Sequence, residues 1–254
     1  MLSLYPLDYE PFKRSVDGEL NPFLRWMRRR HYGYRCRAVR RAKPAGGQLV
    51  DVGCGTGGFL CELQQGGGWQ AMGIDINQRA LNVARRQGVQ VRCGELGDLG
   101  LPTASFDVVT MWEVIEHVLN PWDTLAEIHR ILKPNGVLLL STPNGESWQA
   151  QLWGMHWLGW EVPRHLQIFS PQTLRQLLED AGFEIVRRLS FPMERFYAVE
   201  SARRWLQAHV SGSTQLIAHR LTPLVGLAAW PVFRLIDRIP SASSIVLEAR
   251  VVSR

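Results

Sequence analysis

The sequence predicts an α/β fold in which helices cover both faces of a mainly parallel sheet. Short apolar runs alternate with helix-length segments between residues 48 and 141, a pattern typical of parallel sheets with crossover helices. The first apolar run, Leu49 to Val52, breaks into a glycine-rich stretch at 53–58 and resumes as a helix start at Phe59. A strand, a glycine turn and a helix in this order indicate a nucleotide-binding crossover.

The remaining elements follow from apolar runs, helix caps and helix breakers. Strands are expected at 48–53, 70–75, 89–93, 106–111, 137–141, 183–189 and 245–252, and helices at 22–43, 57–66, 77–87, 121–132 and 171–181. Asn77 is a plausible N-cap, and Pro121 suits the first turn of a helix. Residues 133–136 read as a turn before the fifth strand.

The chain divides into a basic N-terminal extension, residues 1–45, and one large domain, residues 46–254. Two insertions interrupt the domain. Residues 143–170 are rich in Trp, Gly and Pro and are expected above the carboxyl edge of the sheet, where open α/β sheets bind ligands. Residues 191–243 are expected to be helical and to lie between the last two strands.

The glycine turn has a physical role. Gly53, Gly55 and Gly57 allow a sharp turn and let a ligand approach the main chain. Asp75 ends the second apolar run, 24 positions after Asp51, where an acid can accept both ribose hydroxyls. The turn matches neither the dinucleotide fingerprint nor a phosphate-binding loop. It therefore favours a nucleoside without a pyrophosphate, or else a tight connection with no ligand.

Four segments together resemble a known superfamily. Residues 51–57 (DVGCGTG), 73–76 (GIDI), 94–96 (GEL) and 105–109 (SFDVV) resemble the first to fourth motifs of class I S-adenosylmethionine-dependent methyltransferases. The resemblance covers roughly residues 48–142 and extends more loosely to about 190. It implies a seven-stranded Rossmann-like sheet with an antiparallel last strand, and S-adenosylmethionine as cofactor.

The resemblance also implies roles for individual residues. Gly53, Gly55 and Gly57 would line the methionine part of the cofactor, with Asp51 orienting the loop or the ammonium group. Asp75 would hold the ribose. The adenine would be surrounded by Ile76, by Glu95 in the place of the usual Asp, and by Leu96 and Trp112. For Ile76 and Leu96, ordinary core packing is the alternative.

Acidic and histidine side chains follow the fourth strand. If residues 113–117 begin a helix, Glu113, Glu116 and His117 share one face, and His165 could reach the same cleft. This E-x-x-E-H pattern resembles those of ubiquinone-pathway O-methyltransferases and of small-RNA 2′-O-methyltransferases. The catalytic candidates are His117, His165 and Glu113. Three interpretations remain open: a helix cap, a general base, or a divalent metal held by Glu113, Glu116, His117 and His165.

Charge and cysteine content indicate the partners and the cellular compartment to expect. The formal net charge is +6, and residues 1–43 hold eleven Lys or Arg against four Asp or Glu. Such a segment can attract nucleic acid or anionic lipid, or form a solvated helix face. The four cysteines have no metal-like spacing, so we expect reduced thiols and a cytoplasmic location. No stretch of 18 apolar residues predicts a spanning helix, and the N-terminus does not read as a signal peptide.

Residues 214–239 contain an uncharged run at 221–233 that arginines flank. It suits either a lid helix on the domain or a peripheral membrane contact. The sequence thus predicts a methyltransferase for a small, hydrophobic or lipid-like acceptor, with O-methylation favoured. The alternatives are an RNA methyltransferase that uses the basic N-terminus, and a non-catalytic cofactor-binding protein.

Overall fold

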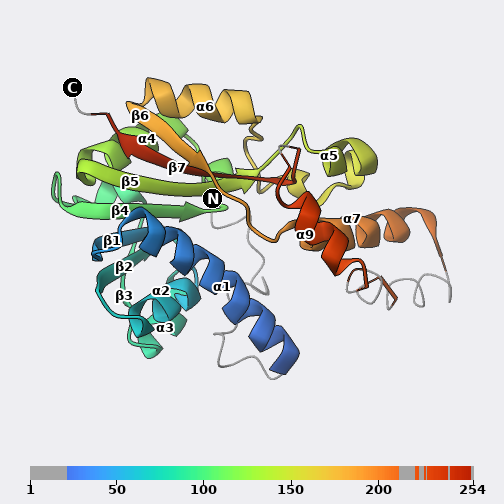
Figure 1. The fold of residues 1–254 in the computed structure, drawn as a ribbon, viewed down its shortest axis with the longest axis horizontal. Helices are drawn as coiled ribbons and strands as arrows, with labels where there is room; N and C mark the ends of the chain where they lie inside the picture. Colours follow the sequence, from blue (N-terminus) through green and yellow to red (C-terminus); the bar gives the residue numbers. More distant parts are fainter. Residues whose placement is uncertain (1–21, 212–220, 223–225, 227, 240, 253–254) are drawn as a thin grey trace.

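The computed structural model of this chain describes residues 22–211, 221–222, 226, 228–239 and 241–252 (Figure 1). Its centre is a seven-stranded sheet with the order β3-β2-β1-β4-β5-β7-β6. The strands are β1 (Gly47–Val52), β2 (Trp69–Asp75), β3 (Gln90–Cys93), β4 (Phe106–Trp112), β5 (Leu132–Pro143), β6 (Phe183–Arg188) and β7 (Ser244–Val251). β7 runs antiparallel to both β5 and β6, and the other pairs are parallel. This confirms the predicted fold class.

Helices cover both faces of the sheet (Figure 1). The helices α1 (Pro22–Ala42), α2 (Gly58–Gln65) and α3 (Gln78–Arg86) share one hydrophobic core with the sheet residues Leu49 and Val108. The helices α4 (Pro121–Ile131) and α6 (Pro171–Asp180) share the other core with Val50 and Val109. Consecutive strand residues therefore face opposite layers, as the pleat requires.

Side-chain caps start several of these helices. Asn77 accepts hydrogen bonds from the backbone N–H groups of Arg79 and Ala80 at the start of α3. Asn120 caps α4 in the same way, and Pro121 occupies its first turn. Such caps satisfy N–H groups that have no partner within the helix. The caps fix where each helix begins, and therefore fix the loop that joins the helix to the strand before it.

The N-terminal helix α1 is more than a basic surface helix. Cys36 and Val39 in its second half are buried in the core that it shares with α2 and α3. Arg37 and Arg41 are exposed, and the Arg40 guanidinium donates to the Leu63 carbonyl of α2 at 3.2 Å. The second half of α1 thus packs as part of the α/β layer.

The two insertions pack against each other beyond the carboxyl edge of the sheet. The first contains α5 (Trp148–Trp153) and the 3₁₀ turns η5 (Gly154–His156) and η6 (Leu158–Trp160), and the second contains α7 (Glu194–His209) and α9 (Trp230–Ile236). The buried Glu194 carboxylate accepts hydrogen bonds from Trp148 Nε1 and Gln149 Nε2, both at 2.8 Å. The rings of Trp157 and Tyr197 stack with their centroids 5.8 Å apart.

Two local predictions were wrong. Residues 133–136 lie within β5, whose pairing with β4 shifts register between Phe106 and Val108, and Asn135 has a φ of 60°. Residues 113–117 do not form an α-helix. Glu113 adopts a left-handed conformation with φ 56°, and only the short 3₁₀ turn η4 (Ile115–His117) follows. A left-handed residue ends any helical path, so Glu113 does not share a helix face with Glu116 and His117.

Within the described residues, no helix combines the length and apolar character needed to cross a bilayer. The predicted membrane-contact segment, 214–239, lies partly outside the described residues, which include only 221–222, 226 and 228–239 of it. All four cysteines are free thiols.

Candidate functional site

A cavity of about 460 Å³ opens at the carboxyl ends of β1, β2 and β4. Its size falls within the range of roughly 300–1,000 Å³ that small-ligand sites occupy. Its walls combine the glycine turn, the ends of the three strands, and one edge of α1. The lining includes Tyr32, Arg35, Asp51, Gly53, Gly55, Asp75, Ile76, Glu95, Leu96, Glu113 and His117.

The glycine turn holds a left-handed backbone at three positions. Gly53, Gly55 and Gly57 have φ values of 75°, 53° and 77°. A Cβ on Gly53 would lie 2.3 Å from Val114 Cγ2, whereas a Cβ on Gly55 would meet nothing within 4 Å. Gly55 therefore presents bare backbone to open space on the cavity side, as a close-fitting ligand requires.

Asp75 organises this turn while facing the cavity. One carboxylate oxygen accepts the Gly55 N–H and the other accepts the Asn77 N–H, each at 2.8 Å. Burial raises the pKa of this carboxyl, and these backbone N–H groups act in the opposite direction. Each carboxylate oxygen can accept more than one hydrogen bond, so the same group can also receive ribose hydroxyls.

Asp51 is buried beneath the turn. Its carboxyl accepts a hydrogen bond of 2.6 Å from the Thr110 hydroxyl, which lies opposite it on β4. Burial raises the pKa of Asp51 to about 7. A carboxyl in this state gains from a cation placed beside it, and the ammonium of an amino-acid ligand would supply one.

Arg35 is a site residue that the sequence interpretation missed. It reaches the cavity from α1, and its Cζ lies 5.3 Å from the Trp112 ring centroid. Burial lowers its pKa, the charges of Asp51 and Glu113 act in the opposite direction, and its buried Nε has no hydrogen-bond partner in the described residues. A guanidinium beside Asp51 suits a ligand that carries both a carboxylate and an ammonium group. Only the arginine-rich N-terminal helix signalled this residue, and it does not single out one arginine.

Most of the predicted cofactor residues line the cavity, and two do not. Asp51, Gly53, Gly55, Asp75, Ile76, Glu95 and Leu96 are in its wall, whereas Gly57 and Trp112 are absent from it. A Cβ on Gly57 would lie 2.9 Å from Ala84 Cβ, so this glycine permits close packing of α2 on α3. The Trp112 ring packs between Phe59 and Phe191, behind Arg35.

Glu113 lines the cavity on the side that faces the second insertion. Its carboxylate accepts hydrogen bonds from the Tyr197 hydroxyl and the Ser244 hydroxyl, each at 3.2 Å. Tyr197 is buried on α7, so the second insertion reaches the site directly. Burial raises the pKa of Tyr197 well above its ordinary value, and the charge of Glu113 adds to the shift.

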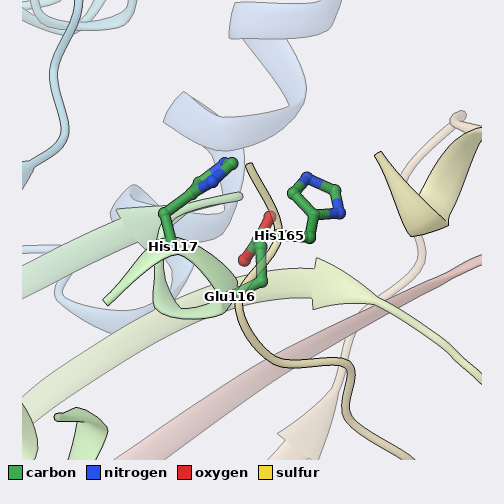
Figure 2. Close-up of side chains that lie close together, drawn as sticks. All are labelled: Glu116, His117 and His165. Atoms are coloured by element: carbon green, nitrogen blue, oxygen red, sulfur yellow. The ribbon is translucent and has the colours of Figure 1, made fainter. Parts of the chain in front are cut away.

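Glu116, His117 and His165 lie close together at the base of the first insertion (Figure 2). One ligand atom from each falls within 4.8 Å of the other two, and no other such group of three was found among the described residues. Glu116 is fully buried, with one oxygen bonded to the Thr142 hydroxyl and Oε1 without a partner. Burial raises the pKa of Glu116 well above its ordinary value, and the nearby Glu113 charge adds to the rise.

His165 lies between two oxygen atoms of the first insertion. Its Nδ1 lies 2.6 Å from the Gly159 carbonyl, and its Nε2 lies 3.2 Å from the Glu161 carboxylate. Burial alone would raise the pKa of Glu161, but the His165 hydrogen bond and the neighbouring arginines hold it below its ordinary value. These two contacts fix the orientation of the His165 ring.

Of the four residues predicted as possible metal ligands, Glu116, His117 and His165 are therefore brought together, whereas Glu113 lies outside the cluster of three. The Nδ1 of His117 donates to the Arg164 carbonyl at 2.9 Å, which leaves Nε2 as the unprotonated nitrogen of the neutral ring. Burial lowers the pKa of His117, and His165, whose ring centroid is 4.7 Å away, acts in the same direction.

Comparisons with known proteins agree with this geometry. A family profile described as a methyltransferase domain matches residues 24–188. A ubiquinone biosynthesis O-methyltransferase of Thiobacillus denitrificans is 31% identical over 202 residues, which cover 72% of this chain and 81% of the relative. A probable S-adenosylmethionine-dependent methyltransferase of Mycolicibacterium smegmatis is 33% identical over 165 residues, and the match spans 63% of this chain but only 60% of that relative.

Solved structures share the fold. The crystal structure of the [4+2]-cyclase SpnF matches with a TM-score of 0.59 and 26% identity, covering 85% of this chain and 79% of that one. A phosphoethanolamine N-methyltransferase of Haemonchus contortus matches with a TM-score of 0.57 and 18% identity, covering 87% of this chain and 52% of that one, which shows the fold alone. The family profile covers the glycine turn, Asp75 and Arg35 together. The chain therefore belongs to the class I S-adenosylmethionine-dependent methyltransferases, with S-adenosylmethionine as its methyl donor.

Proposed function

We propose that this protein methylates an oxygen of a small, hydrophobic acceptor. The observation that carries the proposal is the fixed tautomer of His117 at the acceptor side of the cavity, where Nδ1–H is held by the Arg164 carbonyl. The ubiquinone O-methyltransferase relatives support an oxygen acceptor. The tryptophan-rich first insertion, which packs beyond the carboxyl edge of the sheet, supports an apolar one.

The cofactor half rests on residues with complementary charges. We assign the carboxylate of the methionine part to Arg35, its ammonium to Asp51 and the ribose hydroxyls to Asp75. When bound, the sulfonium supplies an electrophilic methyl group. The residues of the chain then need only exclude water, orient the two reactants and remove one proton.

We assign proton removal to Nε2 of His117. This neutral nitrogen takes the proton of the acceptor hydroxyl while the oxygen forms the new bond to the methyl carbon. The electron pair of the breaking carbon–sulfur bond stays on sulfur, which leaves as a neutral thioether. A largely buried imidazole suits this step because burial lowers its pKa, which keeps the ring neutral at pH 7. Glu113 stays within the same cavity and orients the acceptor through its carboxylate.

The test is a methyl-transfer assay with labelled S-adenosylmethionine, a panel of catechols and quinone precursors, and a lipid extract. We expect label in an organic-soluble product and a loss of at least 100-fold in His117→Gln. His209→Gln is the control, because His209 is exposed at the end of α7. Cofactor binding without any labelled product from these acceptors would contradict the proposal.

We also propose peripheral contact with a membrane through residues 214–239, because a hydrophobic acceptor resides in or near lipid. The described part of that segment contains α9, whose exposed side chains are apolar. Vesicle sedimentation of the full chain tests the contact, and an absence of sedimentation with any lipid would contradict it.

A further inference from the structure

Apolar side chains are exposed on three helices that project together beyond the sheet. Val232 and Leu235 on α9 are 56% and 66% exposed, and Phe196 on α7 and Trp26 on α1 are each 52% exposed. Figure 1 shows α1, α7 and α9 extending past the same end of the sheet.

Contacts join these helices into one surface. Arg195 Nη2 of α7 lies 3.2 Å from Met27 Sδ of α1. A Cβ on Gly226, just before α9, would lie 2.5 Å from Val199 Cγ2 of α7. The first turns of α1, the start of α7 and the α9 segment are therefore neighbours.

Two exposed apolar side chains of α9 form a short stripe. Val232 and Leu235 occur at i and i+3, which places them on one face of the helix. Ile239, in the turn that follows α9, is also exposed. The other side of α9 faces inward, where Asp237 is buried and accepts the backbone N–H of Glu194. The apolar stripe thus points away from the domain.

Charge surrounds the apolar residues. Helix α1 contains no acidic residue, and its Arg29 and Arg30 are exposed beside Trp26. Arg238 is exposed beside the α9 stripe. Glu200 on α7 is already paired with Arg203 at 2.6 Å. Among the described residues, the exposed charge of this surface is therefore mainly cationic, which complements anionic headgroups.

We propose that α1, α7 and α9 form a single membrane-docking surface for bilayers rich in anionic lipid. The α9 stripe and Phe196 enter the interfacial layer, Trp26 lies at the headgroup level, and Arg29, Arg30 and Arg238 contact lipid phosphates. RNA would use the arginines but has no use for Val232 and Leu235, so the apolar stripe favours a bilayer. The inference rests on the peripheral contact proposed above and assigns the basic helix to it.

The experiment is co-sedimentation of the full chain with vesicles of phosphatidylcholine alone or mixed with phosphatidylglycerol, at low and high salt. We expect binding that requires phosphatidylglycerol and weakens with salt. The substitution Arg29→Gln removes one positive charge and should lower the vesicle partition coefficient about fivefold, and Leu235→Gln should lower it about tenfold. The matched controls are Arg41→Gln, at the far end of α1, and Val186→Gln, an exposed residue of β6.

Three results would overturn the docking surface: no binding to anionic vesicles at low salt, binding that Leu235→Gln leaves unchanged, or equal losses in the controls. A protein that binds RNA but not vesicles would assign the arginines to nucleic acid instead. In that case Arg29→Gln would weaken RNA binding and Leu235→Gln would not. Calorimetry with S-adenosylmethionine on the same samples separates the two proposals. If the wild type binds the cofactor but not vesicles, only the docking surface is contradicted. If the wild type does not bind the cofactor, the proposed function is contradicted.

Discussion

The carboxylate of Asp75 holds the backbone of Gly55: its Oδ2 accepts the Gly55 N–H at 2.8 Å, across the gap between β2 and the turn after β1. The same carboxylate fixes the start of the next loop through Asn77. One side chain thus shapes two loops of the cavity before any ligand arrives. With Asp75 assigned to the ribose as proposed above, its effect on cofactor binding would combine a direct contact with the ordering of these loops.

Asp75→Ala should weaken S-adenosylmethionine binding about 100-fold, because both the ribose contact and the turn are lost. Calorimetric titration measures this change. Asp75→Asn keeps one acceptor oxygen and should lose about tenfold. The control is Asp180→Ala, an exposed acid at the end of α6, and an equal loss in that variant would contradict the assignment.

Gly55→Ala should reduce cofactor affinity more than it reduces stability. The added methyl group meets no protein atom within 4 Å but points into the ligand space, and the left-handed φ of 53° costs about 1 kcal/mol. Gly88→Ala is a matched control, since Gly88 has φ 80° and the same open surroundings. The melting temperature should fall by a similar amount in both variants, and only Gly55→Ala should bind the cofactor more weakly than the wild type. Unchanged affinity in that variant would remove Gly55 from the binding surface.

Arg35→Met should weaken cofactor binding by tenfold or more without lowering stability. The buried guanidinium has an unpartnered Nε and a pKa that burial lowers, so an apolar replacement relieves a desolvation cost. Arg37→Met changes an exposed arginine two positions along the same helix and serves as the control. If both variants bind S-adenosylmethionine like the wild type, Arg35 does not hold the methionine carboxylate.

Asp51 should make the unliganded protein less stable as the pH rises. Its pKa is about 7 in the fold against about 3.9 in an unfolded chain, so the native state binds more protons between these values. Stability therefore falls from about pH 4 to about pH 7, and Asp51→Asn should remove this slope. Relative to the wild type, the free energy of unfolding of Asp51→Asn should be higher by at most about 4 kcal/mol at pH 8, and this difference should vanish near pH 3. Urea unfolding at several pH values measures it, and parallel curves for both proteins would contradict the prediction.

Glu116→Gln should leave the melting temperature and the response to chelator nearly unchanged. Burial raises the pKa of this carboxyl well above its ordinary value and so favours the neutral acid, which an amide of the same shape replaces at little cost. Glu116→Ala should lose about 2–4 kcal/mol through the cavity it leaves. A fall in the wild-type melting temperature with EDTA, together with bound metal in the purified protein, would instead support the metal interpretation.

The strands, the glycine turn and Asp75 were predictable because they depend on local sequence patterns. Apolar runs located all seven strands within about two residues of their observed ends, apart from the early start of β5. Glycine spacing and the acid after β2 located the turn and Asp75. These features lie within single crossover units, where neighbouring residues determine the conformation.

The surroundings of Glu113 and His165 were less predictable for physical reasons. Glu113 adopts a left-handed conformation that glutamate seldom takes, so the helix on which a shared face of Glu113, Glu116 and His117 depended does not form. Arg35 and Tyr197 reach the site from α1 and α7, which lie far from the motifs in the chain. The ring of His165 lies against both Gly159 and Glu161, and only the folded insertion shows both contacts.

The place of β7 in the sheet has a consequence for how the chain is made. β7 lies between β5 and β6, yet residues 189–243 separate it from β6 in the sequence. During synthesis the backbone groups on the facing edges of β5 and β6 stay unpaired until residues 244–251 leave the ribosome. Open strand edges of this kind invite pairing with other chains. The long second insertion thus sets the interval for which a nascent chain is prone to aggregate, and a chaperone that acts during translation would protect it at that stage.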